Sequence, residues 1–334
     1  MRYNPSHRRM PLRALITGAG GFVGGHLCAY LLAHTDWELL GTVYPHPVES
    51  QPEDARLRLK FANLCDPERA RALFDEAQPD YIFHLAAQSF VPASFADPWD
   101  TLQNNIRSEL NLLEAVRQSG RDTRMLVIGS NEEYGAPRPE ELPQVEQSPL
   151  RPNNPYAVSK VAQDFLGLQY HLAYGLPVVR VRPFNHTGPG QSPRFVVPAF
   201  ASQIARIEAG QQEPVMKVGN LAAARDFSDV RDIVRAYHLT ATQGEAGEVY
   251  NLASGKAQAI QGLLDTLLGY SQAEIRVERD PARYRPVDVP EVYGSAAKFH
   301  RLTGWELEIP FEQTLRDTLE YWRGQVGTSE QVGK

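Results

Sequence analysis

The sequence contains little cysteine and no excess of positive charge. Its 334 residues include only two cysteines, Cys28 and Cys65, which lack the spacing of metal ligands and cannot form a disulfide framework. We therefore predict reduced, structural thiols and no bound metal. Acidic residues outnumber basic ones by 40 to 34, which gives a formal net charge of -6. This balance does not favour nucleic acid or an anionic membrane as a partner.

Long hydrophobic runs are also missing. No apolar segment is long enough to span a bilayer, and the basic segment 1–11 lacks the apolar stretch of a secretory signal. We expect residues 1–11 to be a disordered lead-in and the protein to be cytoplasmic. The chain length suits one large α/β unit or two closely joined lobes.

Short apolar segments alternate with segments of helical periodicity through the first half of the chain. The expected strands are 13–17, 38–43, 81–85, 125–128 and 178–181, and the expected helices include one opened by Asp66-Pro67 and the long segments 101–118 and 156–174. Short, wholly apolar strands are typical of parallel sheets that are covered on both faces. We predict an α/β fold with a Rossmann-type, doubly wound parallel sheet.

The amino-acid composition of the sequence changes after Arg182. Proline- and glycine-rich stretches at 183–198 and 281–290 are interleaved with shorter helical segments, 260–268 and 311–322. Residues 226–253 again show a helix followed by a strand. We therefore expect a first lobe over 12–182 and about 226–255, and a smaller α/β lobe over 183–225 and about 256–325.

A glycine-rich turn follows the first predicted strand. In Thr17-Gly18-Ala19-Gly20-Gly21-Phe22-Val23-Gly24, glycines at three-residue intervals allow a tight turn and close approach of the backbone to a pyrophosphate. The helix that begins there directs its free N–H groups at the phosphates. We predict a dinucleotide site. The spacing G-x-x-G-x-x-G is the form found in short-chain dehydrogenases/reductases.

The choice between NAD and NADP is open in the sequence. An acidic residue for the NAD ribose or an arginine for the NADP phosphate would follow the second strand, where this chain has Thr42-Val43-Tyr44-Pro45-His46. Arg56 or His46 could reach a phosphate, and both are equally well explained as ordinary surface residues.

Tyr156 and Lys160 begin a predicted helix. Their i, i+4 spacing puts the phenol and the ammonium on one face, and a nearby cation is expected to lower the phenol pKa from its usual value of about 10. Ser130 follows the apolar strand 125–128, at the edge of the sheet where open α/β sheets bind ligands. We predict that Tyr156 exchanges a proton with substrate while Ser130 bonds the reacting oxygen.

With this turn, Ser130, Tyr156 and Lys160 in order, the chain resembles the extended short-chain dehydrogenase/reductase family, specifically its nucleotide-sugar epimerases, dehydratases and reductases. Further matches are His-Leu-Ala-Ala-Gln-Ser at 84–89, Asn105 before Asn-Leu-Leu-Glu-Ala at 111–115, and Arg-Pro-Phe-Asn at 182–185. The resemblance extends over residues 12–323. It implies an NAD(P)-binding first lobe, a nucleotide-sugar-binding second lobe, and a homodimer through a four-helix contact of 101–118 and 156–174.

The resemblance also implies roles for individual residues. The residues expected to bind NAD or NADP are Gly18, Gly21, Phe22, Val23, Gly24, Asn63, Leu64, Leu85, Ala86, Ala87, Asn105, Tyr156 and Lys160. Segments 184–193, 217–221, 225–227 and 283–290 are similar to the GDP-sugar branch. The residues expected to bind a GDP-sugar are Asn185 and Val196 (sugar and diphosphate), Lys217 (base), Arg225 and Arg285 (diphosphate) and Asp288 (ribose).

Three functions are compatible with these residues. Within the branch, the resemblance favours an NAD(P)H-dependent reduction of the C4 keto group of GDP-4-keto-6-deoxy-D-mannose to a GDP-6-deoxyhexose of the GDP-rhamnose type. The alternative is a GDP-mannose 4,6-dehydratase that retains NADP and uses Glu132 as base, although Thr-Gly-Pro-Gly-Gln at 187–191 differs from the run expected of it. A nonenzymatic nucleotide-binding regulator is a third possibility, and the presence of Tyr156 and Lys160 argues against it.

Overall fold

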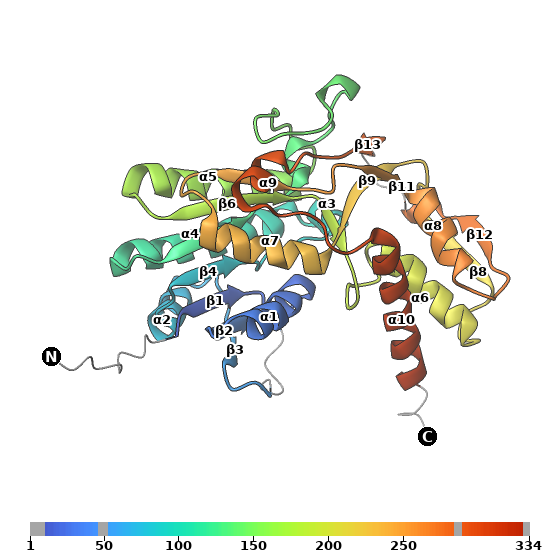
Figure 1. The fold of residues 1–334 in the computed structure, drawn as a ribbon, viewed down its shortest axis with the longest axis horizontal. Coiled ribbons are helices and arrows are strands. Elements are labelled where there is room, and N and C mark those ends of the chain that lie inside the picture. Colours follow the sequence, from blue (N-terminus) through green and yellow to red (C-terminus); the bar gives the residue numbers. More distant parts are fainter. Residues whose placement is uncertain (1–10, 46–52, 284–288, 330–334) are drawn as a thin grey trace.

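A seven-stranded parallel sheet forms the centre of the molecule. The computed structural model describes residues 11–45, 53–283 and 289–329. The strands lie in the order β10-β6-β5-β4-β1-β2-β3 (Figure 1), which is the doubly wound arrangement with its crossover between β1 and β4. They are β1 (Arg13–Thr17), β2 (Glu38–Val43), β3 (Leu57–Phe61), β4 (Tyr81–His84), β5 (Arg124–Ile128), β6 (Val178–Pro183) and β10 (Val249–Leu252). The predicted fold class is confirmed.

Helices cover both faces of this sheet, which explains the apolar character of its strands. Leu15 and Ile82 face one apolar core and Ile16 and Phe83 face the other, because successive side chains of a strand point to opposite faces. One layer consists of α1 (Phe22–His34), α7 (Val230–Gln243) and α9 (Ala297–Thr303), and the other of α2 (Pro67–Ala77), α4 (Pro98–Ser119) and α5 (Pro155–Tyr174). The short helix α3 (Val91–Ala96) precedes α4.

A second lobe with its own apolar core lies at one end of the sheet, where α6, α8 and α10 pack together (Figure 1). Its helices are α6 (Val196–Glu208), α8 (Ile260–Gly269) and α10 (Phe311–Ser329), and its strands are β7 (Asn185–Thr187), β8 (Val215–Val218), β9 (Ala224–Asp229), β11 (Ala257–Ala259), β12 (Arg276–Arg279) and β13 (Glu291–Val292). Short 3₁₀ helices η1 (Asn131–Tyr134), η2 (Pro139–Glu141) and η3 (Pro281–Arg283) lie in the connections.

The segment after β9 returns to the central sheet. β10 pairs in parallel with β6, and α7 packs against α1 on the sheet. The helix and strand expected within 226–253 are therefore present, although the residue boundaries of the two lobes stay a prediction. Within the described residues, none of the helices is long and apolar enough to cross a membrane.

Candidate active site

The glycine-rich turn lies between the end of β1 and the start of α1. Gly18 has φ +71°, and a Cβ on Gly24 would stand 2.2 Å from the carbonyl oxygen of Gly18. Only glycine fits these two positions. Gly21 precedes α1, and none of the described side chains caps the helix there. The N–H groups of its first turn, including those of Phe22 and Val23, therefore suit a phosphate, and the turn fits a dinucleotide.

Side chains from three neighbouring strands fix this turn. The Gly18 N–H donates to Thr42 Oγ1 at 3.0 Å, and the Ala86 N–H donates to Thr17 Oγ1 at 3.1 Å. Thr17 Oγ1 also bonds His84 Nδ1 at 2.9 Å. No role for Thr42 or His84 was predicted from the sequence. Their positions at the ends of strands beside the turn were the only feature of the sequence that could have indicated this role.

The other residues expected to bind the cofactor follow the ends of β3 and β4. Asn63 and Leu64 come after β3, and Leu85, Ala86 and Ala87 come directly after β4. Asn105 lies on α4 and is fully buried. Its side chain donates to Gln88 O at 3.1 Å and to Ser159 Oγ at 2.9 Å, and accepts from the Gln88 N–H at 2.8 Å. Asn105 therefore holds the loop after β4 against α5.

Arg56 has a structural explanation. Its guanidinium donates to the carbonyl oxygens of Thr35 and Leu32, each at 2.8 Å, at the carboxyl end of α1, and forms an ion pair with Asp54 at 2.7 Å. A helix favours a cation at that end. The interpretation of Arg56 as an ordinary surface residue thus fits better than a phosphate contact. His46 lies outside the described residues.

The structure brings Ser130 and Tyr156 together. Ser130 follows β5 and precedes η1, where its Oγ accepts from the Glu132 N–H at 3.2 Å and its own N–H donates to Glu133 Oε1 at 2.7 Å. Tyr156 lies buried in the first turn of α5 and shares a hydrogen bond with the Ser130 side chain. The two hydroxyl groups predicted to meet the reacting oxygen are therefore adjacent.

One electrostatic expectation is wrong in this geometry. Burial raises the pKa of Tyr156, and the hydrogen bond to Ser130, rather than the Lys160 ammonium, opposes the rise. Lys160 Nζ lies 5.9 Å from the centre of the Tyr156 ring and donates to Ile128 O at 2.8 Å. Burial lowers the pKa of Lys160 to about 8, while Glu109 and Glu133 favour its charged form. The cation is thus directed to a strand carbonyl.

Glu132 and Arg225 line one pocket. Asn154 Nδ2 donates to Glu132 Oε2 at 3.0 Å, and Asn154 Oδ1 accepts from the Ala157 N–H at 2.8 Å, which caps α5. The pocket is lined by Val91, Phe95, Asn131, Glu132, Gly135, Asn153, Asn154, Arg225, Val289 and Val292. A carboxylate from the first lobe and an arginine from the second therefore face the same space.

The remaining residues expected to bind substrate are not among the described residues that line this pocket. Asn185 begins β7, and Val196 is the first residue of α6. Lys217 is exposed on β8, away from this pocket, and its N–H donates to Gln203 Oε1 at 3.0 Å. Arg285 and Asp288 lie outside the described residues. Among the residues that the structure describes, no group of three or more His, Cys, Asp or Glu side chains could hold a metal.

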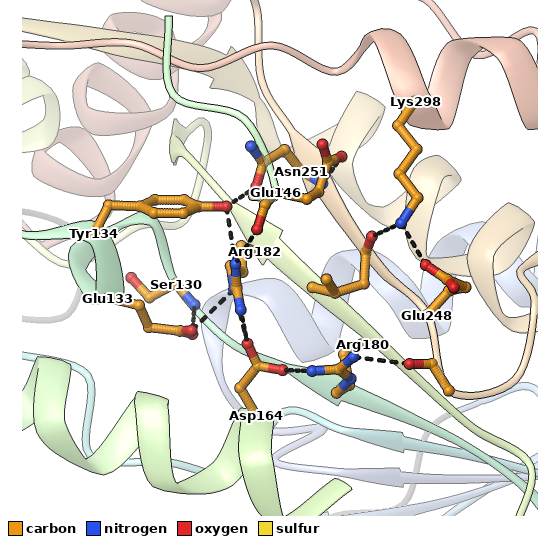
Figure 2. A network of polar contacts seen from close by, with 12 residues as sticks. Ser130, Glu133, Tyr134, Glu146, Asp164, Arg180, Arg182, Glu248, Asn251 and Lys298 are labelled. Carbon is orange, nitrogen blue, oxygen red and sulfur yellow. Dashed lines mark hydrogen bonds and ion pairs between the residues drawn. The ribbon is translucent and has the colours of Figure 1, made fainter. Parts of the chain in front are cut away.

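A buried ion-pair network lies beneath Ser130 (Figure 2). Asp164 on α5 pairs with both Arg180 and Arg182 of β6, and Arg182 Nε lies 3.0 Å from Glu133 Oε2. Arg182 also donates to Tyr134 Oη at 3.1 Å. The network fixes η1, and with it Ser130, against β6 and α5. In the sequence, the two arginines that alternate within an apolar strand indicated such a network, but the sequence did not identify their partners.

The sequence matches the GDP-mannose 4,6 dehydratase family over residues 15–318. GDP-6-deoxy-D-mannose reductase of Pseudomonas aeruginosa is 42% identical over 318 residues, covering 95% of this chain and 99% of that protein. GDP-mannose 4,6 dehydratase 2 of Arabidopsis thaliana is 32% identical over 324 residues, covering 91% and 84%. Both reductases and dehydratases are therefore similar to this chain over most of its length.

Solved structures agree in fold. The structure of RMD from Pseudomonas aeruginosa complexed with NADPH superposes with a TM-score of 0.82 at 40% identity, covering 94% of this chain and 99% of that one. UDP-glucose 4-epimerase of Thermus thermophilus in complex with NAD gives a TM-score of 0.83 at 28% identity, with the same coverage of 94% and 99%. The fold thus occurs in relatives solved with either dinucleotide.

Proposed function

Because the chain belongs to the GDP-mannose 4,6 dehydratase family, we propose that it reduces the C4 keto group of GDP-4-keto-6-deoxy-D-mannose with NAD(P)H. The product is a GDP-6-deoxyhexose of the GDP-rhamnose type. The observation that carries the proposal is the 42% identity to a GDP-6-deoxy-D-mannose reductase over 95% of this chain, against 32% to the plant dehydratase over 91%.

The residues of the turn fit the cofactor. Gly18, Gly21 and Gly24 let the backbone approach the pyrophosphate, and the first turn of α1 supplies N–H donors. Bound NAD(P)H supplies the hydride. In this proposal Lys160 holds the nicotinamide ribose and Ser130 holds the carbonyl oxygen of the sugar.

Tyr156 is suited to act as the acid. Reduction of a ketone develops negative charge on its oxygen, which must receive a proton. Since burial raises the pKa of Tyr156, the phenol carries its proton throughout the neutral range. The hydrogen bond to Ser130 keeps the two hydroxyl groups adjacent, so that one substrate oxygen could contact both. Tyr156 therefore protonates the developing alkoxide while Ser130 stabilises it.

Glu132 keeps the dehydratase as a second candidate. Its carboxylate lines the same pocket as Arg225, where a GDP-sugar diphosphate is expected. A carboxylate beside the sugar could remove a proton from C5, which a dehydratase requires. Reduction needs no such base. Glu132 is compatible with either reaction, so the choice depends on which substrate is consumed.

Two parallel assays separate the candidates. One vessel receives GDP-mannose alone, and the other receives the 4-keto-6-deoxy sugar with NADH or NADPH. We expect stoichiometric oxidation of the reduced cofactor in the second vessel only. Conversion of GDP-mannose without net change in cofactor absorbance would establish the dehydratase, because that reaction returns the hydride that it removes.

We further propose that the protein is a homodimer formed through α4 and α5. Val158, Phe165 and Leu172 recur at seven-residue intervals along α5 and are exposed, Leu172 by 74%. Trp99, on the neighbouring helix α4, is 70% exposed. An apolar stripe on two packed helices is typical of a helical interface between subunits.

A further inference from the structure

A fully buried carboxylate lies on α4, the helix that packs along α5. Glu109 on α4 is 0% exposed, and α4 packs along α5. One turn earlier on α4, Asn105 bonds Ser159 of α5 at 2.9 Å. Residues four positions apart share one helix face, so Glu109 and Gln163 form the next layer of the same contact. Lys160 directly follows Ser159 on α5.

Glu109 has no strong hydrogen-bond donor of its own. Both of its carboxylate oxygens and both polar atoms of the Gln163 amide are buried without a well-aligned partner among the described residues. The Gln163 amide nevertheless lies near enough to favour the charged form of Glu109. A buried carboxylate without a counter-charge is strongly unfavourable. Glu109 must therefore be protonated or paired with a cation.

Lys160 is the cation whose charge acts most strongly on Glu109. Burial raises the pKa of Glu109 well above its usual range, and the Lys160 charge is the largest influence that opposes this rise. Glu109 is in turn the largest charge that favours the Lys160 ammonium. The other titratable groups around this pair are Glu133 on η1, Asp164 on α5 and His84 at the end of β4. Asp164 and Glu133 are held by Arg182, and burial together with Lys160 keeps the pKa of His84 low, at about 3.

We propose that Glu109 is a positioning residue for Lys160: its carboxylate is the counter-charge that keeps the buried ammonium protonated, so that the two groups hold one proton between them. The inference rests on the proposed function in one respect, since Lys160 is taken to bind the nicotinamide ribose. Glu109 itself does not touch cofactor or substrate. It acts through the charge of Lys160.

A pH profile reports this pairing. Burial raises the pKa of Tyr156 well above the neutral range, so the alkaline limb of kcat/KM is assigned to Lys160, whose pKa lies at about 8. Lys160 is charged below its pKa and neutral above it. Removing a nearby negative charge lowers that pKa. The limb should therefore move to lower pH when Glu109 is neutralised.

The test compares the wild type with Glu109→Gln, which keeps the shape and removes the charge. We expect the alkaline limb to move down by about one pH unit. Glu109→Asp retains a carboxylate and should keep the limb close to that of the wild type. Glu114→Gln removes a charge from a partly exposed position of the same helix, where Glu114 pairs with Arg117, and should leave the limb in place. An identical limb in the wild type and Glu109→Gln overturns the proposal.

A second readout needs no sugar. The binding of NADH and NADPH is measured by their fluorescence between pH 6 and 10. We expect binding to weaken as Lys160 loses its proton, and this weakening should occur at lower pH in Glu109→Gln than in the wild type. Superposed binding curves overturn the pairing. If the wild type binds cofactor with the expected pH dependence but reduces no keto sugar, the proposed function fails while the role of Glu109 stands. Should Glu109→Gln not fold, the proposal predicts that Glu109→Asp folds and retains the wild-type curve, and an altered curve contradicts it.

Discussion

At the scale of single residues, the phenol of Tyr156 is the group on which the proposed chemistry depends. Its burial keeps it protonated, and it shares a hydrogen bond with Ser130. We expect Tyr156→Phe to lower kcat by about 10²- to 10⁴-fold, the usual contribution of a positioned acid, while NADPH binding measured by fluorescence changes little. Tyr174→Phe, an exposed position at the end of α5, serves as the control. Full turnover by Tyr156→Phe would remove this residue from the mechanism.

Arg56 provides a second prediction at this scale. Because its guanidinium is bonded to the end of α1 and to Asp54, Arg56→Ala should lower the melting temperature. The ratio of kcat/KM for NADPH to that for NADH should stay unchanged. A selective loss of activity with NADPH would show that Arg56 does contact the 2′-phosphate.

At the scale of elements, the glycine turn and α1 act as one unit. A Cβ on Gly24 would stand 2.2 Å from Gly18 O and 2.7 Å from Ala19 Cα, whereas a Cβ on Gly25 would meet nothing within 4 Å. We expect Gly24→Ala to cost about 1–3 kcal/mol in unfolding free energy, as overpacking does, and to weaken dinucleotide binding. Gly25→Ala is the matched control and should retain both. Equal behaviour of the two variants would refute this account of the turn.

A second prediction for the elements concerns the stability that the ion pairs between α5 and β6 contribute. Asp164→Asn leaves Arg180 and Arg182 without a shared carboxylate in a buried site. Removing one partner of a buried ion pair lowers the free energy of unfolding by about 3–5 kcal/mol. Chemical denaturation should show this loss, while Asp75→Asn, which breaks an exposed pair with Arg71 on α2, should change stability little. A comparable loss in both variants would contradict a special role for the buried network.

Much of the element order could be predicted from the sequence, because short apolar strands and the glycine turn have local signatures. The strands at 13–17 and 38–43 appear as expected. The partners of Arg180 and Arg182 could not be predicted, since the pairing depends on how α5 packs on the sheet. For the same reason the pKa of Tyr156 was expected to fall and instead rises: helical spacing predicts the neighbour but not the burial.

At the scale of the whole molecule, the exposed stripe on α5 predicts an association. Introducing a charge at its centre with Phe165→Glu, or at Leu172, the more exposed position, should convert a dimer into a monomer, because a buried unpaired carboxylate is unfavourable. Size-exclusion chromatography with light scattering measures the mass. Leu307→Glu, outside α4 and α5, should stay dimeric. A monomeric wild type would contradict the proposed interface.

The two lobes meet in the proposed chemistry. The first lobe contributes Ser130, Glu132 and Tyr156, and Arg225 from β9 lines the same pocket as Glu132. We propose that hydride and proton transfer occur at the sheet edge and that the second lobe anchors the nucleotide sugar. A product labelled at a single carbon would report directly on the position of hydride transfer.

The most direct measurement supplies GDP-4-keto-6-deoxy-D-mannose and NAD(P)H carrying deuterium at the transferable position of its nicotinamide, and locates the label by NMR. We expect one deuterium per product molecule at C4 and none in the C6 methyl group. A product with label at C6, or consumption of GDP-mannose without transfer of label from the added cofactor, would contradict the assignment as a C4 reductase.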